Sequence, residues 1–337
     1  MELLNECIKN KYNVSKELNV SPGTVKRWIE LNSVPPQYTF ELKKLLSHDI
    51  DYNAYSCSQK DQFFTPKKMT SVCWNIFLNQ TGVNIDDYIF IEPSAGDGSF
   101  LDVLPNNTIA LDIEPRHKNI LKQDFLEWKP KDENKNYIVF GNPPFGLRGH
   151  LALKFINHAH TFADYVCFIL PQLFESDGKG SPRKRVQGFN LVYSEKMTDI
   201  FHSPDETQTK INCVFQIWSK SDTCSRVKTK TYDNIPMKVY SLSDGGTVSS
   251  TRNKKMIGKC HIYLPSTCFG KENMKTYNSF EDLPSRRGYG IVFHEDIERF
   301  TEKAKNIDWG LVSFLSTNSA HNLRTSIILE QFLSCNI

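Results

Sequence analysis

The segment from Phe140 to Gly146 holds the residues whose types and spacing point most directly to chemistry. It reads Phe-Gly-Asn-Pro-Pro-Phe-Gly after the apolar run Tyr137–Val139, which predicts a buried strand running into a rigid loop. Two consecutive prolines fix their own backbone angles and cannot continue a strand ladder. Asn142, the carbonyl of Pro143 and the ring of Phe145 are therefore held in set positions. Two acceptors beside a ring suit a planar amine-bearing group, although an ordinary strand-to-loop turn is the alternative for this segment alone.

A glycine-rich turn upstream predicts a ligand site at the end of another strand. Tyr88–Ile91 is apolar, and the following Glu-Pro-Ser-Ala-Gly-Asp-Gly leads into a helix expected from about Ser99. Gly96 and Gly98 leave the backbone bare, so a ligand can approach the turn and the N-terminus of that helix. The turn lacks the Gly-Lys-Ser/Thr of a P-loop and does not match the G-x-G-x-x-G dinucleotide turn.

Two acidic residues further along the chain suit the parts of a nucleoside. The strand expected at 108–112 ends in Asp112, and an acid at the carboxyl end of such a strand fits the two hydroxyls of a ribose. Asp124 and Phe125 then offer an acid and an aromatic ring where an adenine could be held.

Taken in order, these motifs resemble the S-adenosylmethionine-dependent amino-methyltransferases. The closest group is the DNA adenine-N6 methyltransferases of restriction–modification type in which the cofactor motif precedes the catalytic motif, the gamma arrangement. The resemblance covers roughly residues 61–220 and rests on Phe64-Thr65-Pro66, Glu92-Pro93-Ser94-Ala95-Gly96-Asp97-Gly98, Asp112, Asp124-Phe125 and Asn142-Pro143-Pro144-Phe145. It implies an α/β fold with a Rossmann-like class I methyltransferase sheet and helices on both faces, and S-adenosyl-L-methionine as the cofactor.

The resemblance also implies roles for these residues. The Asn142 side-chain oxygen and the Pro143 carbonyl would accept both N–H bonds of an adenine amine and direct its lone pair at the sulfonium methyl. Phe145 would stack on the flipped-out base. The implied catalytic residues are Asn142, Pro143, Pro144 and Phe145. For the cofactor, the Glu92–Gly98 turn and Thr65 would line the methionine part, Asp112 would bind the ribose, and Asp124 and Phe125 would hold the adenine. The implied cofactor-binding residues are Phe64, Thr65, Pro66, Glu92, Pro93, Ser94, Ala95, Gly96, Gly98, Asp112, Asp124, Phe125 and Asn142.

The first 48 residues predict a helix-turn-helix-like unit. A short amphipathic helix is expected at 14–20, Ser21 and Pro22 give a helix-start signal, and a second helix follows at 24–31. Lys26 and Arg27 lie on the polar face of that second helix, which resembles the recognition helix of phage repressor-type proteins. The alternative is a helical pair that only packs on the body or contacts another protein. A polar linker is expected at 49–60.

Basic residues elsewhere suggest contact with a polyanion. Arg183, Lys184 and Arg185 follow Lys179 in a Gly/Ser-rich loop, where they could clamp phosphates, and a mobile solvated loop is the alternative. Ten Lys/Arg against four Asp/Glu lie between positions 222 and 275, among them Lys254 and Lys255, although a solvated basic face is a common reason for such a block. Phe201 is the candidate for the aromatic that stacks on the flipped base in the family.

Length and composition set the class of protein. The chain of 337 residues is expected to hold a catalytic domain at 61–221 and a target-recognition domain of α+β type at 222–337. No apolar run reaches membrane-span length, and the nine cysteines form no C-x-x-C pair, so we expect a cytoplasmic protein with reduced thiols, no membrane contact and no metal. Double-stranded DNA is the expected partner, a restriction endonuclease is a further implied partner, and the oligomeric state stays open with a monomer as the working expectation.

Other substrates and one other class remain open on the sequence. Asn-Pro-Pro-aromatic also serves RNA adenine methyltransferases and enzymes that methylate a glutamine amide, while cytosine-N4 enzymes typically begin the motif with Ser. The helix-turn-helix-like unit and the basic block favour duplex DNA over RNA. A catalytically silent DNA-binding regulator with the same fold is the alternative from another class.

Overall fold

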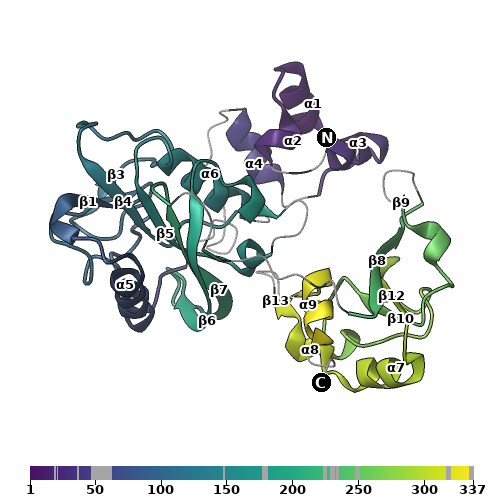
Figure 1. Ribbon diagram of the computed structural model, residues 1–337. Coiled ribbons are helices and arrows are strands. Elements are labelled where there is room, and N and C mark those ends of the chain that lie inside the picture. Colours follow the sequence, from purple (N-terminus) through teal and green to yellow (C-terminus); the bar gives the residue numbers. More distant parts are fainter. Residues whose placement is uncertain are drawn as a thin grey trace. The chain divides into compact units, whose positions relative to one another are not determined.

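The chain forms two compact units, Met1–Lys228 and Thr229–Ile337. The computed structural model describes residues 1–18, 20, 22–35, 38–46, 63–146, 149–176, 181–222, 226–227, 232, 235–246, 251–315 and 320–333 (Figure 1). The linker expected at 49–60, the capping residue Ser21 and the loop residue Lys179 lie outside the described residues. The subdivision of the first unit at positions 48 and 60 stays a prediction.

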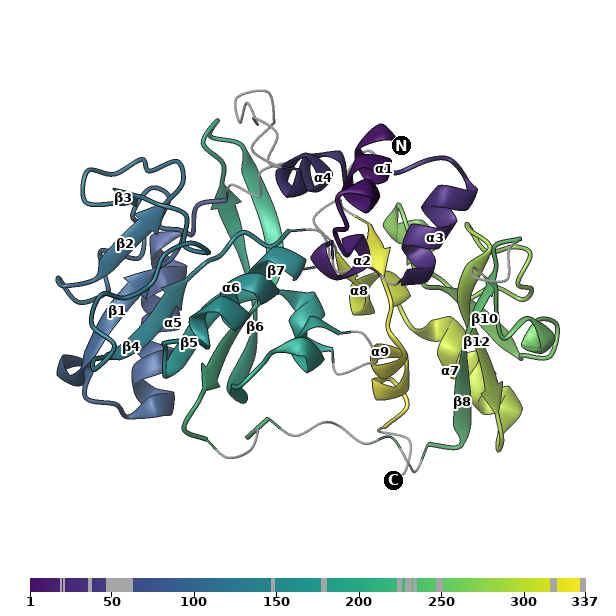
Figure 2. The same cartoon turned by 90° about the horizontal axis from the view of Figure 1, so that it is seen from above.

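The first unit is built on a seven-stranded sheet with the order β3-β2-β1-β4-β5-β7-β6 (Figure 2). β1 pairs in parallel with β2 and β4, β4 pairs in parallel with β5, and β7 runs antiparallel to both of its neighbours. The strands are β1 (Tyr88–Glu92), β2 (Ile109–Asp112), β3 (Leu121–Lys122), β4 (Asn136–Gly141), β5 (Tyr165–Pro171), β6 (Asn190–His202) and β7 (Gln208–Ser219). The expected α/β class, a mostly parallel Rossmann-like sheet, is confirmed.

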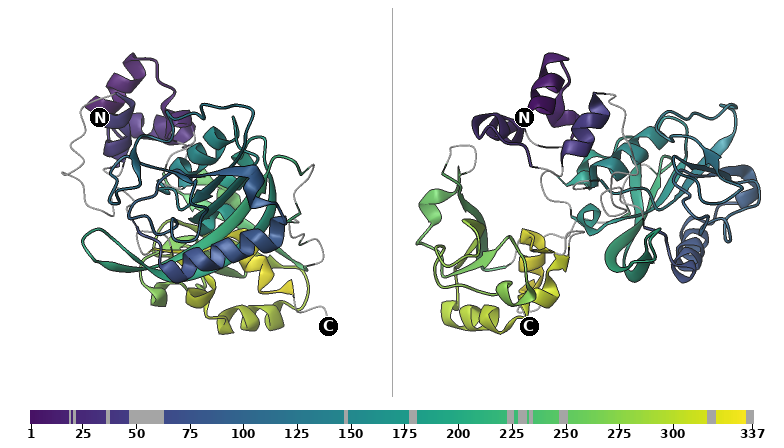
Figure 3. Two further views of the ribbon diagram at one scale, coloured as in Figure 1. Left: turned by 90° about the vertical axis from the view of Figure 1, so that its left-hand side faces the viewer. Right: turned by 180° about the vertical axis from the view of Figure 1, so that it is seen from behind.

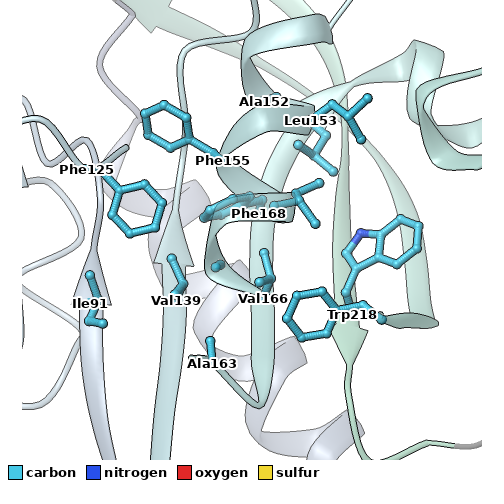
Figure 4. Packing of buried hydrophobic residues seen from close by; sticks show 14 of the residues in the cluster. Ile91, Phe125, Val139, Ala152, Leu153, Phe155, Ala163, Val166, Phe168 and Trp218 are labelled. Carbon is cyan, nitrogen blue, oxygen red and sulfur yellow. The ribbon is translucent and has the colours of Figure 1, made fainter. Parts of the chain in front are cut away.

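Helices cover both faces of this sheet. α5 (Lys67–Thr81) lies on one face and α6 (His150–Ala159) on the other (Figure 1). Because successive side chains of a strand point to opposite faces, β4 gives Val139 to the cluster under α6 and Phe140 to the cluster under α5. Figure 4 shows the first of these clusters, in which Phe155 and Ala152 of α6 lie over the strands. This two-sided core forms a rigid base for the loops at the strand ends.

The helix expected from about Ser99 does not form, so that prediction was wrong. Residues 99–103 make successive turns in which Leu101 N–H donates to the Gly98 carbonyl and Val103 N–H to the Phe100 carbonyl. Only six residues separate Gly98 from Pro105, and the residue before a proline is disfavoured in the helical region. The chain is therefore too short here for more than one turn.

The N-terminal part of the first unit has four helices: α1 (Glu2–Lys9), α2 (Val14–Glu17), α3 (Pro22–Glu30) and α4 (Thr39–Leu45). They enclose a small apolar cluster in which the rings of Trp28 and Tyr38 lie 4.6 Å apart. Asn13 caps α2 by accepting a hydrogen bond from the Lys16 N–H. α2 and α3 occupy the positions of the expected helix pair, and α1 and α4 complete its core.

The second unit is an α+β arrangement with its own core. One sheet has the antiparallel order β10-β12-β8-β9 and another the order β11-β14-β13. Phe293 of β12 and Phe300 of α7 stack at 5.7 Å within this core, and Figure 3 shows α7 beside the strands. The elements are β8 (Met237–Asp244), β9 (Thr251–Arg252), β10 (Ile262–Pro265), β11 (Thr267–Cys268), β12 (Arg287–Phe293), β13 (Phe314–Leu315), β14 (His321–Asn322), α7 (Ile297–Asn306), α8 (Trp309–Val312) and α9 (Thr325–Glu330).

Two kinds of feature are missing from the described residues. None of their helices combines the length and the apolar character that crossing a membrane requires. They also contain no group of three or more His, Cys, Asp and Glu side chains arranged to hold a metal ion.

Candidate active site

The ends of β1 and β4 meet at the point where the strand order of the sheet reverses. In open α/β sheets, ligands bind outside the carboxyl ends of the strands at such a switch point. The glycine turn leaves β1 there, and the Asn-Pro-Pro-Phe loop leaves β4 beside it. The Ser94 hydroxyl joins the two by donating to the backbone carbonyl of Asn142 at 3.0 Å. Topology thus brings the two strongest sequence motifs together.

The side chain of Asn142 presents one buried acceptor without a partner. Its Nδ2 donates to the Phe63 carbonyl at 3.3 Å and lies 3.2 Å from Oγ1 of Thr65. A carbonyl oxygen can only accept, so the amide nitrogen must face Phe63 and the amide oxygen must point the other way. That oxygen, Oδ1, is buried and receives no hydrogen bond. Leaving a buried polar atom unpaired costs about 1–3 kcal/mol, which a ligand N–H would recover.

Pro143 and Pro144 lie in the loop as expected. Pro143 is buried next to Asn142, and Pro144 is half-buried. The role of the Pro143 carbonyl as a second acceptor stays a prediction.

The carboxylate of Asp112 holds the glycine turn in shape. It accepts the N–H of Gly96 at 2.8 Å and the N–H of Glu114 at 2.7 Å. Gly96 has a φ of +53°, a conformation that favours glycine, and the Ala95 N–H donates to the Leu111 carbonyl on β2. Burial raises the pKa of Asp112, and the two backbone N–H groups offset part of that rise. A carboxylate has about four acceptor positions, so two remain for hydroxyl groups.

Glu92 lies at the end of β1 with only 1% of its surface exposed. A Cβ atom at Gly141 would lie 2.3 Å from its Oε1, so the carboxyl group packs directly on the β4 backbone. Its Oε2 has no hydrogen-bond partner. Burial, followed by the charges of Asp112 and Asp97, raises the pKa of Glu92 well above its usual value. Burial therefore disfavours the charged form of this carboxyl group.

The segment Phe64-Thr65-Pro66 joins the same site from the start of the catalytic region. The backbone of Phe64 pairs with that of His202 at the end of β6, with N–H to carbonyl distances of 2.7 and 3.3 Å. Its ring covers the turn so closely that a Cβ atom at Gly96 would lie 3.0 Å from it. Pro66 is the N-cap residue of α5, and Thr65 is buried against Asn142.

The two residues expected at the cofactor adenine lie in different surroundings. The Gln123 N–H donates to the Asp112 carbonyl, which brings Asp124 close to the end of β2, and Asp124 accepts the Leu126 N–H at 2.8 Å. The ring of Phe125 is 1% exposed and packs 5.1 Å from Phe155 of α6. Contrary to expectation, this ring belongs to the core and has no exposed face for an adenine. Pro93, Ser94, Ala95 and Gly98 all lie in the turn.

Both aromatic candidates for base stacking are buried. Phe201 of β6 is 0% exposed and sits in the cluster under α5, so its ring has no face for a base and this expectation is corrected. Phe145 is 6% exposed, and its carbonyl accepts the N–H groups of Leu151 and Ala152 in the first turn of α6. This conformation does not offer the Phe145 ring to a base, and its stacking role stays a prediction.

The candidate basic residues of the first unit lie in two places. Lys26 is exposed and Arg27 half-buried on α3. Lys184 is exposed and Arg185 half-buried on a short 3-10 helix, η6 (Pro182–Arg185), and both line a cavity of about 950 Å³ with Lys16 and Lys154.

Two further basic candidates already have protein partners. Arg183 on η6 donates to the carbonyls of Val227 at 3.1 Å and Glu175 at 3.5 Å, so the expected phosphate clamp does not match its position. In the second unit, the 3-10 helix η8 (Lys254–Met256) carries Lys254, which lies 3.4 Å from Asp244, and the exposed Lys255.

Sequence reasoning missed two features that bear on this site. The Phe63 carbonyl orients Asn142, and it could have been suspected only because it precedes the Phe-Thr-Pro motif. Glu41 of α4 lies 3.3 Å from His150, the first residue of α6 after the loop. No local pattern links those two positions.

Comparison with known proteins gives distant likenesses of fold. Neither a protein-family model nor a curated protein matches the sequence. A proposed RNA methyltransferase from Pyrococcus horikoshii is 18% identical with a TM-score of 0.39, over 56% of this chain and 98% of that chain. Magnesium protoporphyrin IX methyltransferase from Synechocystis is 12% identical with a TM-score of 0.32, over 61% and 95%. The type IIG restriction endonuclease BpuSI is 16% identical with a TM-score of 0.37, over 68% and 35%. Similarities this low do not indicate a substrate.

Proposed function

We propose that this protein transfers a methyl group from S-adenosylmethionine to the N6 amine of a flipped-out adenine in double-stranded DNA. The observation that carries the proposal is the buried, unpartnered Oδ1 of Asn142, fixed in direction by Phe63 and Thr65 at the switch point of the sheet. An acceptor held in this way suits an aromatic amine, because the adenine amine is a poor nucleophile until its N–H bonds are engaged.

The residues around the glycine turn fit the proposed cofactor. The remaining acceptor positions of Asp112 and the buried Oε2 of Glu92, which has no hydrogen-bond partner, suit a ligand with a ribose and a polar methionine part. When bound, S-adenosylmethionine would supply an electrophilic methyl group on sulfur.

The residues of the Asn-Pro-Pro-Phe loop would act on the amine itself. Asn142 Oδ1 accepts one of its N–H bonds, and the Pro143 carbonyl accepts the other. Both bonds draw electron density onto the amine nitrogen and hold its lone pair toward the cofactor side. The proton that the amine loses after transfer can pass to water, since the reaction needs no strong base. Catalysis is then positioning and electrostatic stabilisation, with no covalent intermediate on the protein.

Duplex DNA is the substrate we favour because of the N-terminal helices. α3 begins at Pro22, exposes Lys26 and follows a short α2, as in helix-turn-helix units that place the start of the second helix in the major groove. The exposed Lys184 adds positive charge in the same unit, where phosphates could be held. A base buried in a duplex must leave the stack to reach Asn142.

Transfer of a tritiated methyl group to duplex DNA, RNA and total protein in parallel tests the proposal. We expect label on duplex DNA, and nuclease digestion should recover it as N6-methyladenine. Label only on RNA would make the RNA adenine alternative correct. Label only on protein would point to a glutamine amide, and no label on any substrate would favour the silent DNA-binding regulator.

A further inference from the structure

The loop that carries Asn142 is packed onto one buried histidine. Gly146, its last glycine, has a φ of +64° and lies against His150 so closely that a Cβ atom there would be 2.6 Å from the imidazole ring. The Gly149 N–H donates to the Gly146 carbonyl, and the Phe145 carbonyl accepts from Leu151 in the first turn of α6. The end of the loop therefore packs directly on the His150 ring.

The His150 ring is held in turn by an acid from the N-terminal helices. Its Nε2 lies 3.3 Å from Oε2 of Glu41, and the two side chains are 1% and 16% exposed. Burial alone would raise the pKa of Glu41, but the close approach and charge of His150, with Lys44 and Lys154, bring it below its usual value. A second contact between the same parts, Glu17 to Lys154 at 3.4 Å, is more exposed and lies one turn further along α6.

We propose that Glu41 is a positioning residue that couples the N-terminal helices to the Asn142 loop through His150. The chain of contacts runs from α4 to the imidazole ring and from the ring to Gly146, four residues beyond Asn142. A ligand bound at α3 would then change the position of the loop, because α3 and α4 share one apolar core through Trp28 and Tyr38. The kinetic consequence rests on the proposed function, whereas the structural consequence does not.

Glu41→Ala tests the coupling, with Glu17→Ala as the matched control that removes the more exposed acid. Amide hydrogen exchange, followed by mass spectrometry on the full chain without ligands, should rise about tenfold or more in peptides that span Asn142 to Gly146 in Glu41→Ala only. With DNA and S-adenosylmethionine, kcat should fall about tenfold while the Kd for the cofactor stays within twofold. Equal loop exchange in Glu41→Ala and Glu17→Ala would overturn the proposal.

His150→Asn tests the same coupling without changing α4. It should raise exchange in the same peptides, and the double variant Glu41→Ala/His150→Asn should exchange no faster than His150→Asn alone. Additive effects would show that the two residues act separately and would overturn the coupling. Glu41→Gln, which keeps an oxygen acceptor at the same place, should bring exchange back toward that of the unmodified chain. If the unmodified protein methylates nothing, the proposed function fails, and the exchange comparison still decides this inference.

Discussion

The amide nitrogen of Asn142 lies 3.2 Å from the hydroxyl oxygen of Thr65, a residue 77 positions earlier in the chain. This contact makes the segment before α5 and the loop after β4 parts of one site. It also explains why a single amide can be so well oriented: its nitrogen has two neighbouring acceptors, and its oxygen has no choice of direction.

Asn142→Ala should reduce the rate of methyl transfer by at least about 10²-fold, because it removes the oriented acceptor while leaving the glycine turn intact. The rate is measured with saturating cofactor and DNA, and cofactor affinity is measured by calorimetry and should change little. Asn136→Ala is the matched control, since Asn136 is exposed at the opposite end of the same strand. Near-normal turnover in Asn142→Ala would show that the site is placed wrongly.

Asp112→Ala should weaken cofactor binding about 10- to 100-fold. Two backbone N–H groups of the turn lose a charged acceptor, and a 10- to 100-fold weakening corresponds to about 1.4–2.8 kcal/mol, roughly the contribution of one such hydrogen bond. Calorimetric titration with S-adenosylhomocysteine measures the change. Asp102→Ala is the control, because Asp102 is 56% exposed and pairs with the exposed Lys67. Equal affinities in the two variants would contradict the role given to Asp112.

Glu92→Gln should stabilise the protein increasingly as the pH rises. The folded-state pKa of Glu92 is raised by burial and by Asp112 and Asp97, so its contribution to stability is full below about pH 4.3, its ordinary pKa, and is lost as the pH rises through the raised value. Glutamine does not titrate and avoids this loss. Thermal unfolding without ligand should show the two midpoints close at acidic pH and the variant higher at pH 8. A difference independent of pH would contradict the assignment; Glu127→Gln, at an exposed site, is the control.

Lys26→Ala should weaken binding to duplex DNA and lower the salt dependence of that binding by about one unit of slope, as expected for the loss of one phosphate contact. Lys9→Ala removes the same charge from an exposed position on α1 and should change the slope less. Fluorescence anisotropy at several salt concentrations gives both values. Identical slopes in the two variants would leave the helices with a packing role only.

Much of the sheet could be predicted because its signals are local. β1 and β4 are mostly apolar runs, β1 followed by Pro93 and β4 ending in Gly141, and such runs in alternation with turns predict a doubly wound sheet. The motifs at the strand ends then follow from topology, which explains why the glycine turn, Asp112 and Asn142 do come together. The missing helix was also visible in the sequence, because only six residues separate Gly98 from Pro105, too few for the helix that the position suggested.

The aromatic residues could not be assigned in the same way. A phenylalanine beside a binding motif can face a ligand or the core, and only the neighbouring elements decide between them. Phe125 meets α6, and Phe201 lies under α5, so both are core residues here. The Glu41–His150 pair joins two helices that are distant in sequence, and no periodicity within either helix could indicate it.

The pairing of Phe64 with His202 has a consequence for how the protein is made. The ring that covers the glycine turn is anchored by a strand that is among the last parts of the sheet to leave the ribosome. Non-local pairings form late because the intervening chain must first be ordered. We therefore expect a nascent chain to bind the proposed cofactor poorly until β6 has emerged.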